Sequence, residues 1–452
     1  MQYLNFFFNC VISNKIKNNP NMIHMMKISI FGSGYAGLVT ACGLSKFYEV
    51  ICVDIDKNKV ESINKGICPI YEQGIEQYIK NIKAVTSAEK AVKETEISFI
   101  CIGTPSKEDG SFDYKFLESV SRSIGKVLKE KNSFHIVVVK STVTPGTTEE
   151  IVLPIIEAES KKTAGKDFGI SMNPEFLKEG TAIEDFLSPD RIVIGTIDNK
   201  TKTILNELYK PFNSVILNTD IKTAEMIKIA SNSFLAAKIS FINEISNICR
   251  KLKVNSYKTA EGMGLDKRIA PYFLQSGAGF GGSCFPKDIK ALIAKSRELN
   301  YEPQLLNAVL KINENQPIEI IKMLENKLPS LENKKISILG LSFKPKTDDI
   351  RESPSIKVIS ELLSKNAEIH VFDPIAMENT KKIFENKVNY SKNISESLKN
   401  ASACIIMTDW EDFKKLNKDN FSIMKTKIVI DGRKTISNLE DIDYSSLGGQ
   451  EC

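Results

Sequence analysis

The stretch that decides the fold is KISIFGSGYAGLVTACGLSK, residues 27–46, where an apolar run meets closely spaced glycines and then a helical pattern. Gly32, Gly34 and Gly37 form a GxGxxG frame. The first glycine permits a tight turn, the second lets the backbone approach a pyrophosphate, and the third lets helix and strand pack closely. The amide groups at the start of the helix then point at the phosphates.

The residues after this turn supply the context that the motif requires. A second apolar run, YEVICVDID at residues 48–56, carries Asp54 twenty residues after Gly34. A lone GxGxxG frame is weak evidence, but strand, helix and acidic residue together predict a dinucleotide site. The Asp54 carboxylate is expected to accept hydrogen bonds from ribose hydroxyls and to repel a 2′-phosphate, which favours NAD over NADP. A purely structural glycine turn is the alternative.

Length and composition bound the remaining possibilities. The chain has 452 residues, of which 42% are hydrophobic, so two to four domains with large cores are expected. The net charge of +5 is dispersed, which argues against a nucleic-acid partner, and no segment after the first 25 residues is apolar enough to span a membrane. Nine scattered cysteines without a CxxC pair fit a reducing, cytoplasmic location, and no metal site is expected.

Apolar runs that alternate with helical patterns predict an α/β protein with two Rossmann-like, doubly wound domains. A glycine-free and proline-free segment from Thr219 to about Leu252 predicts one long central helix between them, followed by a small helical region. The predicted boundaries are a leader at 1–25 that is disordered or not translated, an NAD-binding domain at 26–215, a helical dimerisation domain at 216–327, a second Rossmann-like domain at 328–440, and a tail at 441–452.

A second glycine-rich stretch, GAGFGGSCFPKD at residues 277–288, surrounds one thiol. Cys284 precedes Pro286 and a helical pattern, so it is expected at a helix N-terminus with Lys287 close by, where a thiolate is favoured. A thiolate adds to an aldehyde to give a thiohemiacetal, whose oxidation gives a thioester that water hydrolyses. NAD together with an activated cysteine therefore indicates an aldehyde-oxidising step.

Other polar side chains complete this chemistry. Lys228 and Asn232 are four residues apart on the central helix, so they share a face that is suited to stabilising an oxyanion, unless Lys228 is simply solvated. Glu175 and Glu179 follow a strand, and either is placed to orient a hydrolytic water. The three histidines, His24, His135 and His370, are expected to be structural. Lys344 and Lys346 follow a strand that lacks the glycine frame, which suits a nucleotide diphosphate better than NAD.

Several motifs in this order resemble the UDP-glucose/GDP-mannose dehydrogenase family. The resemblance covers about residues 26–440 and rests on FGSGYAG, CIGTP, KSTVTPG, NPEFLKEG, the helix from Glu225 to Glu244, GFGGSCFPKD and GLSFKPKTDDIRESPS. It implies two Rossmann-like domains joined by a long helix, the second binding a UDP-sugar. It also implies oxidation of UDP-glucose to UDP-glucuronate by two successive hydride transfers to NAD.

The resemblance also assigns roles. It implies that Cys284 is the nucleophile, that Lys228 and Asp288 handle the proton and a bound water, that Asn232 and Thr142 position water and oxyanion, and that Glu179 assists thioester hydrolysis near the nicotinamide. The further cofactor contacts that it implies are Lys59, where relatives often have Arg, Thr104, Thr142, Glu179, Lys287 and Arg351. The implied substrate contacts are Glu175, Phe176, Leu177, Lys178, Glu179, Lys228, Asn232, Phe273, Leu274, Gln275, Ser276, Gly277, Phe280, Gly281, Lys344 and Arg433. Arg268 matches a residue that the family donates across a dimer interface, so a homodimer or a larger oligomer is implied.

Three alternatives remain open at this point. GDP-mannose is the second choice of substrate, although Phe285 after the cysteine favours UDP-glucose. A two-electron hydroxyacid dehydrogenase would use the same first domain and give Cys284 no role. A catalytically silent nucleotide-binding protein would not need Cys284, Lys228 and Asp288 together.

Overall fold

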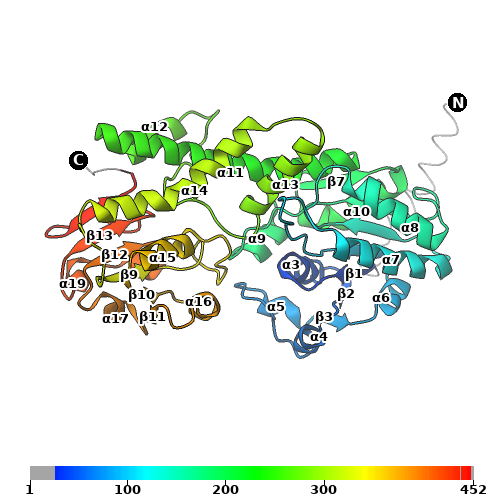
Figure 1. Ribbon diagram of the computed structural model, residues 1–452. Coiled ribbons are helices and arrows are strands. Elements are labelled where there is room, and N and C mark those ends of the chain that lie inside the picture. Colours follow the sequence, from blue (N-terminus) through cyan, green and yellow to red (C-terminus); the bar gives the residue numbers. More distant parts are fainter. Residues whose placement is uncertain (1–25, 438, 449–452) are drawn as a thin grey trace. The chain divides into compact units, whose positions relative to one another are not determined.

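The computed structural model describes residues 26–437 and 439–448, so the predicted leader lies outside the described residues. The chain divides into two compact units (Figure 1). The first runs to Glu108 and continues from Phe112 to Ile229, and the second holds Asp109–Ser111 and continues from Ala230.

The first unit is built on an eight-stranded sheet with the order β3-β2-β1-β4-β5-β6-β7-β8. Its strands pair in parallel, except that β6 and β7 are antiparallel with Ser171 opposite Thr196. The strands are β1 (Lys27–Phe31), β2 (Glu49–Val53), β3 (Ile82–Val85), β4 (Ile97–Ile100), β5 (Ile136–Val139), β6 (Gly169–Met172), β7 (Ile192–Thr196) and β8 (Ile216–Thr219).

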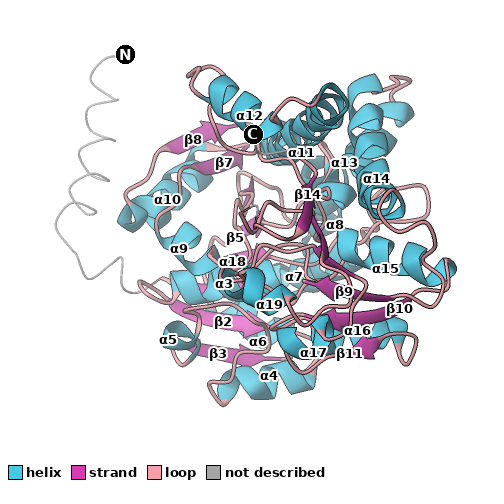
Figure 2. Ribbon diagram, turned by 90° about the vertical axis from the view of Figure 1, so that its left-hand side faces the viewer, coloured by secondary structure: helices cyan, strands magenta, loops and turns pink. Residues whose placement is uncertain are grey.

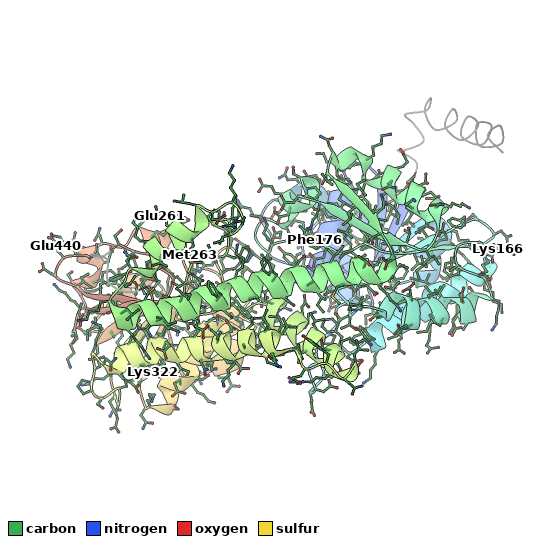
Figure 3. The ribbon with its side chains drawn as sticks, turned by 90° about the horizontal axis from the view of Figure 1, so that it is seen from above. Lys166, Phe176, Glu261, Met263, Lys322 and Glu440 are labelled. Carbon is green, nitrogen blue, oxygen red and sulfur yellow. The ribbon has the colours of Figure 1, made fainter. Side chains whose placement is uncertain are left out.

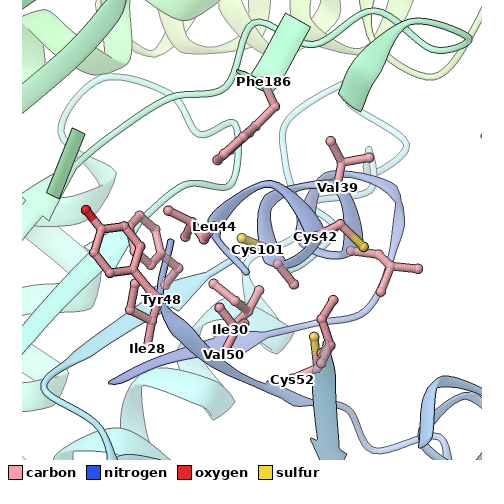
Figure 4. Packing of buried hydrophobic residues seen from close by; sticks show 14 of the residues in the cluster. Ile28, Ile30, Val39, Cys42, Leu44, Tyr48, Val50, Cys52, Cys101 and Phe186 are labelled. Atoms are coloured by element: carbon pink, nitrogen blue, oxygen red, sulfur yellow. The ribbon is translucent and has the colours of Figure 1, made fainter. Parts of the chain in front are cut away.

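Successive residues of these strands enter two different cores. Ile136 and Val138 pack on one face of the sheet, and Val137 and Val139 pack on the other. Because both faces are covered, the strands read as continuous apolar runs rather than as alternating patterns. Figure 4 shows part of the first core, where Cys52 and Cys101 pack among aliphatic side chains.

Helices follow most strands of this unit and cover the two faces. They are α3 (Tyr35–Leu44), α4 (Lys57–Asn64), α5 (Glu76–Ile79), α6 (Ala88–Glu94), α7 (Lys115–Glu130), the π-helix η1 (Thr148–Val152), α8 (Leu153–Ser160), α9 (Ala182–Leu187), α10 (Asn199–Tyr209) and the 3-10 helix η2 (Lys210–Phe212).

The predicted long helix is confirmed as α11, which runs without interruption from Ile221 to Leu252. Its first nine residues belong to the first unit and the remainder to the second. In the second unit α11 lies beside α14, as Figure 3 shows. The two helices are joined by Asn247, which donates to Gln316 over 3.0 Å, and by an ion pair between Arg250 and Glu319.

The second unit contains a six-stranded parallel sheet with the order β11-β10-β9-β12-β13-β14, which repeats the order of the first six strands of the first sheet (Figure 2). Its strands are β9 (Lys335–Leu339), β10 (Glu368–Phe372), β11 (Asn389–Tyr390), β12 (Ala403–Ile406), β13 (Ile428–Asp431) and β14 (Asp443–Ser446). Its helices are α12 (Ser256–Gly264), α13 (Phe285–Glu298), α14 (Gln304–Glu325), α15 (Pro354–Ser364), α16 (Met377–Phe384), α17 (Ile394–Leu398), α18 (Glu411–Lys414) and α19 (Lys418–Phe421).

The observed architecture is therefore the predicted α/β class with two Rossmann-like sheets and a long connecting helix. β14 lies in the segment that the sequence analysis set apart as a tail, so this sheet extends past residue 440. Among the described residues, no helix has both the length and the apolar character that crossing a membrane would require.

Candidate active site

The turn between β1 and α3 has the geometry that the GxGxxG frame predicts. Gly32 has a φ of +98°, and a Cβ there would lie 2.7 Å from the Cys101 carbonyl oxygen. A Cβ on Gly37 would lie 1.9 Å from the Gly32 carbonyl oxygen. A Cβ on Gly34 would meet nothing within 4 Å, so the space beside this residue at the start of α3 is open.

Asp54 lies directly after β2, beside this turn. One of its carboxylate oxygens accepts hydrogen bonds from the Ser33 amide at 2.8 Å and the Ser33 hydroxyl at 2.6 Å, and the other accepts from the Asp56 amide at 3.0 Å. Burial acts to raise the pKa of Asp54, but these hydrogen bonds and the charge of Lys59 outweigh it, so the pKa lies below its ordinary value. Asp54 is therefore an ionised acceptor with Lys59 nearby.

These features fit a bound dinucleotide. The open space at Gly34 faces the N-terminus of α3, where unpaired amides favour a pyrophosphate. Two further candidate cofactor residues meet after β4 and β5, because the Thr104 hydroxyl donates to the Thr142 carbonyl oxygen at 2.8 Å. The first unit thus brings Gly32, Gly34, Gly37, Asp54, Lys59, Thr104 and Thr142 to the carboxyl ends of neighbouring strands of one sheet.

The segment after β6 carries the candidate substrate residues of the first unit. Glu175 forms a 2.9 Å ion pair with Lys228 and accepts a 2.7 Å hydrogen bond from the Leu177 amide. Burial acts to raise the pKa of Glu175, but the charge of Lys228 and the Leu177 hydrogen bond lower it further than burial raises it. The Arg191 guanidinium lies over the Phe176 ring, 3.8 Å from the ring centroid, and the Lys228 ammonium lies 5.4 Å from the same centroid.

The remainder of this segment is held by a residue that sequence reasoning missed. Glu72 is buried, and its carboxylate accepts hydrogen bonds from the Gly180 and Ala182 amides, both at 2.7 Å, and from the Tyr35 hydroxyl. Lys178, by contrast, is largely exposed and pairs with Asp185 at 2.9 Å. Glu72 therefore anchors the backbone next to Glu179, and its position in an irregular segment gave no periodic signal.

In the second unit, the thiol lies where the sequence predicted it. Cys284 is the N-cap of α13, Pro286 follows in the first turn, and the thiol-bearing residue is exposed. Asp288 is only 1% exposed, and its carboxylate accepts from Asn232 at 2.6 Å and from the Lys287 ammonium at 2.7 Å. Four of the predicted residues are therefore brought together in the first turn of one helix and on α11.

The predicted sugar-nucleotide residues of this unit also converge. Gln275 donates to the Arg433 carbonyl oxygen at 3.0 Å, and a Cβ on Gly277 would lie 3.2 Å from the Arg433 guanidinium. Gly282 donates to the Arg351 carbonyl oxygen at 2.8 Å. Gly281 lies beside Phe343, whose ring is also near the Lys344 ammonium. Phe273 and Phe280 both pack against the Phe285 ring, while Leu274 and Ser276 are buried between them in the sequence. Arg351, by contrast, was implied as a cofactor contact.

One predicted residue lies apart from these contacts. Arg268 has 89% of its side chain exposed and forms an ion pair with Asp266 at 2.6 Å. No group of side chains able to hold a metal ion occurs in the described part of the chain.

Two further buried charges escaped the sequence analysis. Glu225 at the start of α11 accepts from the Gly146 amide at 2.6 Å and the Thr148 amide at 2.8 Å, which fixes the loop after Thr142. Lys140 follows β5 and is buried against Asn173. A lysine that ends the apolar run HIVVVKS was a usable signal, because a strand end in an α/β sheet is a frequent site position.

Comparison with known protein families matches three consecutive models. They are the NAD binding domain of the UDP-glucose/GDP-mannose dehydrogenase family at residues 26–213, its central domain at 222–315 and its UDP binding domain at 337–438.

Individual relatives agree with this match. The chain is 42% identical to the UDP-glucose 6-dehydrogenase AglM of Haloferax volcanii, over 93% of this chain and all of that protein. It is also 42% identical to the UDP-glucose 6-dehydrogenase YwqF of Bacillus subtilis, over 94% of this chain and 98% of that protein.

Solved structures show the same relationship. A UDP-glucose dehydrogenase from Pyrobaculum islandicum superposes with a TM-score of 0.88 at 38% identity, covering 94% of this chain and all of that one. A UDP-D-ManNAc dehydrogenase from Pyrococcus horikoshii gives 0.84 at 27% identity, covering 94% and 99%. With its dinucleotide turn, its exposed helix-capping cysteine and matches along nearly its whole length, the chain belongs to the UDP-glucose/GDP-mannose dehydrogenase family.

Proposed function

We propose that this protein is an NAD-dependent enzyme that oxidises UDP-glucose to UDP-glucuronate. The observation that carries this proposal is 42% identity to UDP-glucose 6-dehydrogenases over almost the whole chain. The exposed Cys284 at the start of α13 supports a four-electron reaction, because the second oxidation requires a nucleophile that holds the aldehyde.

The proposed chemistry runs through the Cys284 sulfur. The C6 alcohol loses a proton and a hydride and becomes an aldehyde, to which the thiolate adds to form a thiohemiacetal. Loss of the hydroxyl proton and of a second hydride converts the thiohemiacetal to a thioester. Water then attacks its carbonyl carbon, which breaks the carbon–sulfur bond and releases the carboxylate and the thiol. Two molecules of NAD, bound one after the other, would each accept one hydride.

The family resemblance implies which side chains handle the proton and the water. Asp288 is buried and held by Asn232 and Lys287, so its carboxylate has a fixed orientation for a water molecule or a proton. We assign proton transfer to Lys228 together with Asp288, and stabilisation of the oxyanion to Asn232 and Thr142. Glu179 is assigned to thioester hydrolysis.

The binding residues follow the same assignment. NAD is placed at the glycine turn, with contacts to Asp54, Lys59, Thr104, Thr142, Glu179, Lys287 and Arg351. The sugar nucleotide is placed against residues 175–179, Lys228 and Asn232, residues 273–277, Phe280, Gly281, Lys344 and Arg433, with Arg268 supplied by a second subunit.

The decisive experiment is the stoichiometry of NADH to product with purified UDP-glucose. Two NADH per UDP-glucuronate are expected, and a value of one would replace the proposal with a simple alcohol dehydrogenase. Cys284→Ser should abolish net turnover, whereas Cys68→Ser, which alters a partly buried thiol outside the assigned site, should leave it unchanged.

GDP-mannose remains the competing substrate. A GDP-mannose dehydrogenase from Pseudomonas aeruginosa is 35% identical over 93% of this chain, with a TM-score of 0.54. The ratio of kcat/KM for the two nucleotide sugars decides between them, and a preference for GDP-mannose would overturn the choice of UDP-glucose.

We further propose that the working unit is at least a homodimer. Phe234, Phe241 and Ile248 are exposed on α11 at intervals of seven residues, so they lie along one face of the helix, and Leu265 and Tyr272 are exposed nearby in sequence. An apolar face of this kind is suited to a second copy of the chain. Sedimentation of Phe241→Asp should show loss of the dimer.

The proposed role of Arg268 has its own test. If Arg268 acts across the interface, mixing inactive Arg268→Ala with inactive Cys284→Ser subunits should restore activity, because a hybrid dimer combines one intact thiol with its partner's intact arginine. Absence of restoration in proven hybrids would place Arg268 in its own subunit's site. The domain division predicted from the sequence, with the second Rossmann-like domain extended to include β14, and a cytoplasmic location are retained as parts of the proposal.

A further inference from the structure

Lys140 is a buried lysine for which the proposed mechanism has no use. It follows β5 and is 4% exposed. Its ammonium donates to the Asn173 side-chain oxygen at 2.9 Å and to the Asn173 carbonyl oxygen at 3.3 Å. Within the described residues, no carboxylate oxygen lies within ion-pair distance of this ammonium.

The surroundings of Lys140 are rigid and largely aromatic. Its ammonium lies 5.9 Å from the centroids of Phe99 and Phe186 and 6.0 Å from that of Tyr209. Asn173 is held from other sides, because the Tyr209 hydroxyl also donates to its side-chain oxygen and its own amide donates to the Val193 carbonyl oxygen at 2.7 Å.

Burying this cation opposes folding. Burial lowers the pKa of Lys140 to about 8, and the ionisable groups that act on it are Cys101 and Glu175, which raise its pKa, and Lys228, which lowers it. An apolar side chain of the same volume would avoid the desolvation cost of the ammonium. A buried charge that has hydrogen bonds but no counter-ion, at a strand end beside candidate site residues, indicates a functional position.

The position of Asn173 connects Lys140 to the site. Asn173 precedes Glu175 by two residues, and Glu175 forms the ion pair with Lys228. The positive charge of Lys140 also contributes to lowering the pKa of Glu175. Lys140 therefore acts on Glu175 both through the backbone and through space.

We propose that Lys140 is a positioning residue whose ammonium anchors the Asn173 end of β6 and supplies a fixed positive charge behind the Glu175–Lys228 pair. This inference rests on the proposed role of that pair in binding and proton transfer. Lys140 touches neither substrate nor cofactor in this assignment.

The test compares Lys140→Met with Lys131→Met. Lys131 is a partly buried lysine near the amino ends of β4 and β5, where its ammonium donates to the Val92 carbonyl oxygen at 2.6 Å, whereas Lys140 lies at the carboxyl end of β5. Lys140→Met alone should lower kcat/KM about 10- to 100-fold and move the acid limb of its pH profile upward by about half a unit to one unit, because the pKa of Glu175 rises when the nearby charge is removed.

A second variant separates anchoring from charge. Lys140→Gln retains a donor for Asn173 but no charge, so it should share the displaced acid limb while recovering part of kcat/KM. A pH profile of Lys140→Met that coincides with that of the wild type would overturn the proposal.

A measurement without turnover keeps the inference independent of the proposed function. Urea unfolding of the wild type, Lys140→Met, Glu175→Gln and the double variant should give non-additive midpoints at pH 7, and additivity would refute the coupling. If the wild type does not oxidise UDP-glucose but the four proteins show this non-additivity, the proposed function is refuted and the coupling of Lys140 to Glu175 is still supported.

Discussion

The two sheets share the order of their first six strands and the same first turn, yet only the first sheet leaves that turn open. Gly32 and Gly340 have φ angles of +98° and +97°. Each donates a 2.8 Å hydrogen bond to the last residue of the neighbouring strand, Val53 in one case and Phe372 in the other. The backbone of the second turn is therefore a copy of the first in this respect.

The difference lies in the carboxylate that ends the second strand of each sheet. Asp54 is partly exposed, and beside it Gly34 leaves open space. Asp373 is 1% exposed and accepts hydrogen bonds from Leu341, Ala376 and the Trp410 indole. Asp54 also accepts hydrogen bonds from the protein, but it stays partly exposed. A dinucleotide site thus depends less on the turn itself than on whether the carboxylate that follows it remains accessible.

The largest expected effect is on stability, from Asp373→Ala. Removing this carboxylate leaves several buried donors without partners, which should cost about 3–5 kcal/mol of unfolding free energy. Trp410 is the sole tryptophan of the chain, so its fluorescence follows urea unfolding in the second unit. Asp54→Ala should leave the urea midpoint of that transition unchanged. An equal shift of the midpoint in both variants would contradict the difference drawn between the two aspartates.

The next effect is a pH dependence confined to the first sheet. Burial lowers the pKa of His135 to about 3, and a nitrogen of its ring shares a 2.8 Å hydrogen bond with the Ser98 hydroxyl. In the unfolded chain the His135 imidazole has a pKa of about 6.5, so between that pH and about pH 3 the unfolded chain binds a proton that the folded chain does not. The free energy of unfolding should therefore fall by about 3 kcal/mol between pH 7 and pH 4. Hydrogen exchange of β4 and β5 measures it, and His135→Gln should flatten the dependence.

The third prediction tests the open turn directly. Gly34 has a φ of −72°, which any residue adopts, and serine is a favoured helix N-cap, so Gly34→Ser should fold normally. Its side chain would occupy the open space, and NADH affinity should fall about 100-fold. Gly340→Ser is the matched contrast, because its Cβ would lie 2.6 Å from the Thr408 amide at a positive φ, and it should unfold the second unit. Normal NADH binding by Gly34→Ser would contradict the proposal that the pyrophosphate occupies the open space at Gly34.

The smallest expected effect concerns the ribose contact. Asp54→Asn removes the charged acceptor, so the Kd for NADH should rise about tenfold. The ratio of the Kd for NADPH to the Kd for NADH should fall, because the carboxylate no longer repels the 2′-phosphate. Asp373→Asn should not change NADH binding, because its carboxylate is enclosed. Fluorescence titration measures both values, and a comparable loss in both variants would mean that the second sheet takes part in cofactor binding.

The fold was predictable because its signals are local. Gly32, Gly34 and Gly37 are read from three positions, and the glycine-free, proline-free run that becomes α11 is read from one segment. The antiparallel pairing of β6 with β7 was not predictable, because both strands are short apolar runs whose direction is set by the path of the chain.

The candidate site divides in the same way. Cys284 and Asp288 were found from a motif, and the structure adds that Asn232 and Lys287 hold Asp288. Glu72 was missed because the amides that it binds lie more than one hundred residues away along the chain. Lys140 shows only as one polar residue after an apolar run.

The exposure of Cys284 has a consequence for how this protein meets oxidants and electrophiles. Among the seven cysteines of the described chain, it alone is exposed, Cys68 is intermediate, and the others are buried. Burial raises the pKa of Cys42 and of Cys404, which keeps those thiols in the unreactive protonated form. Among these seven thiols, peroxide or an alkylating reagent would thus concentrate on the Cys284 sulfur, so that oxidation or alkylation within residues 26–448 amounts to titration of the proposed active site.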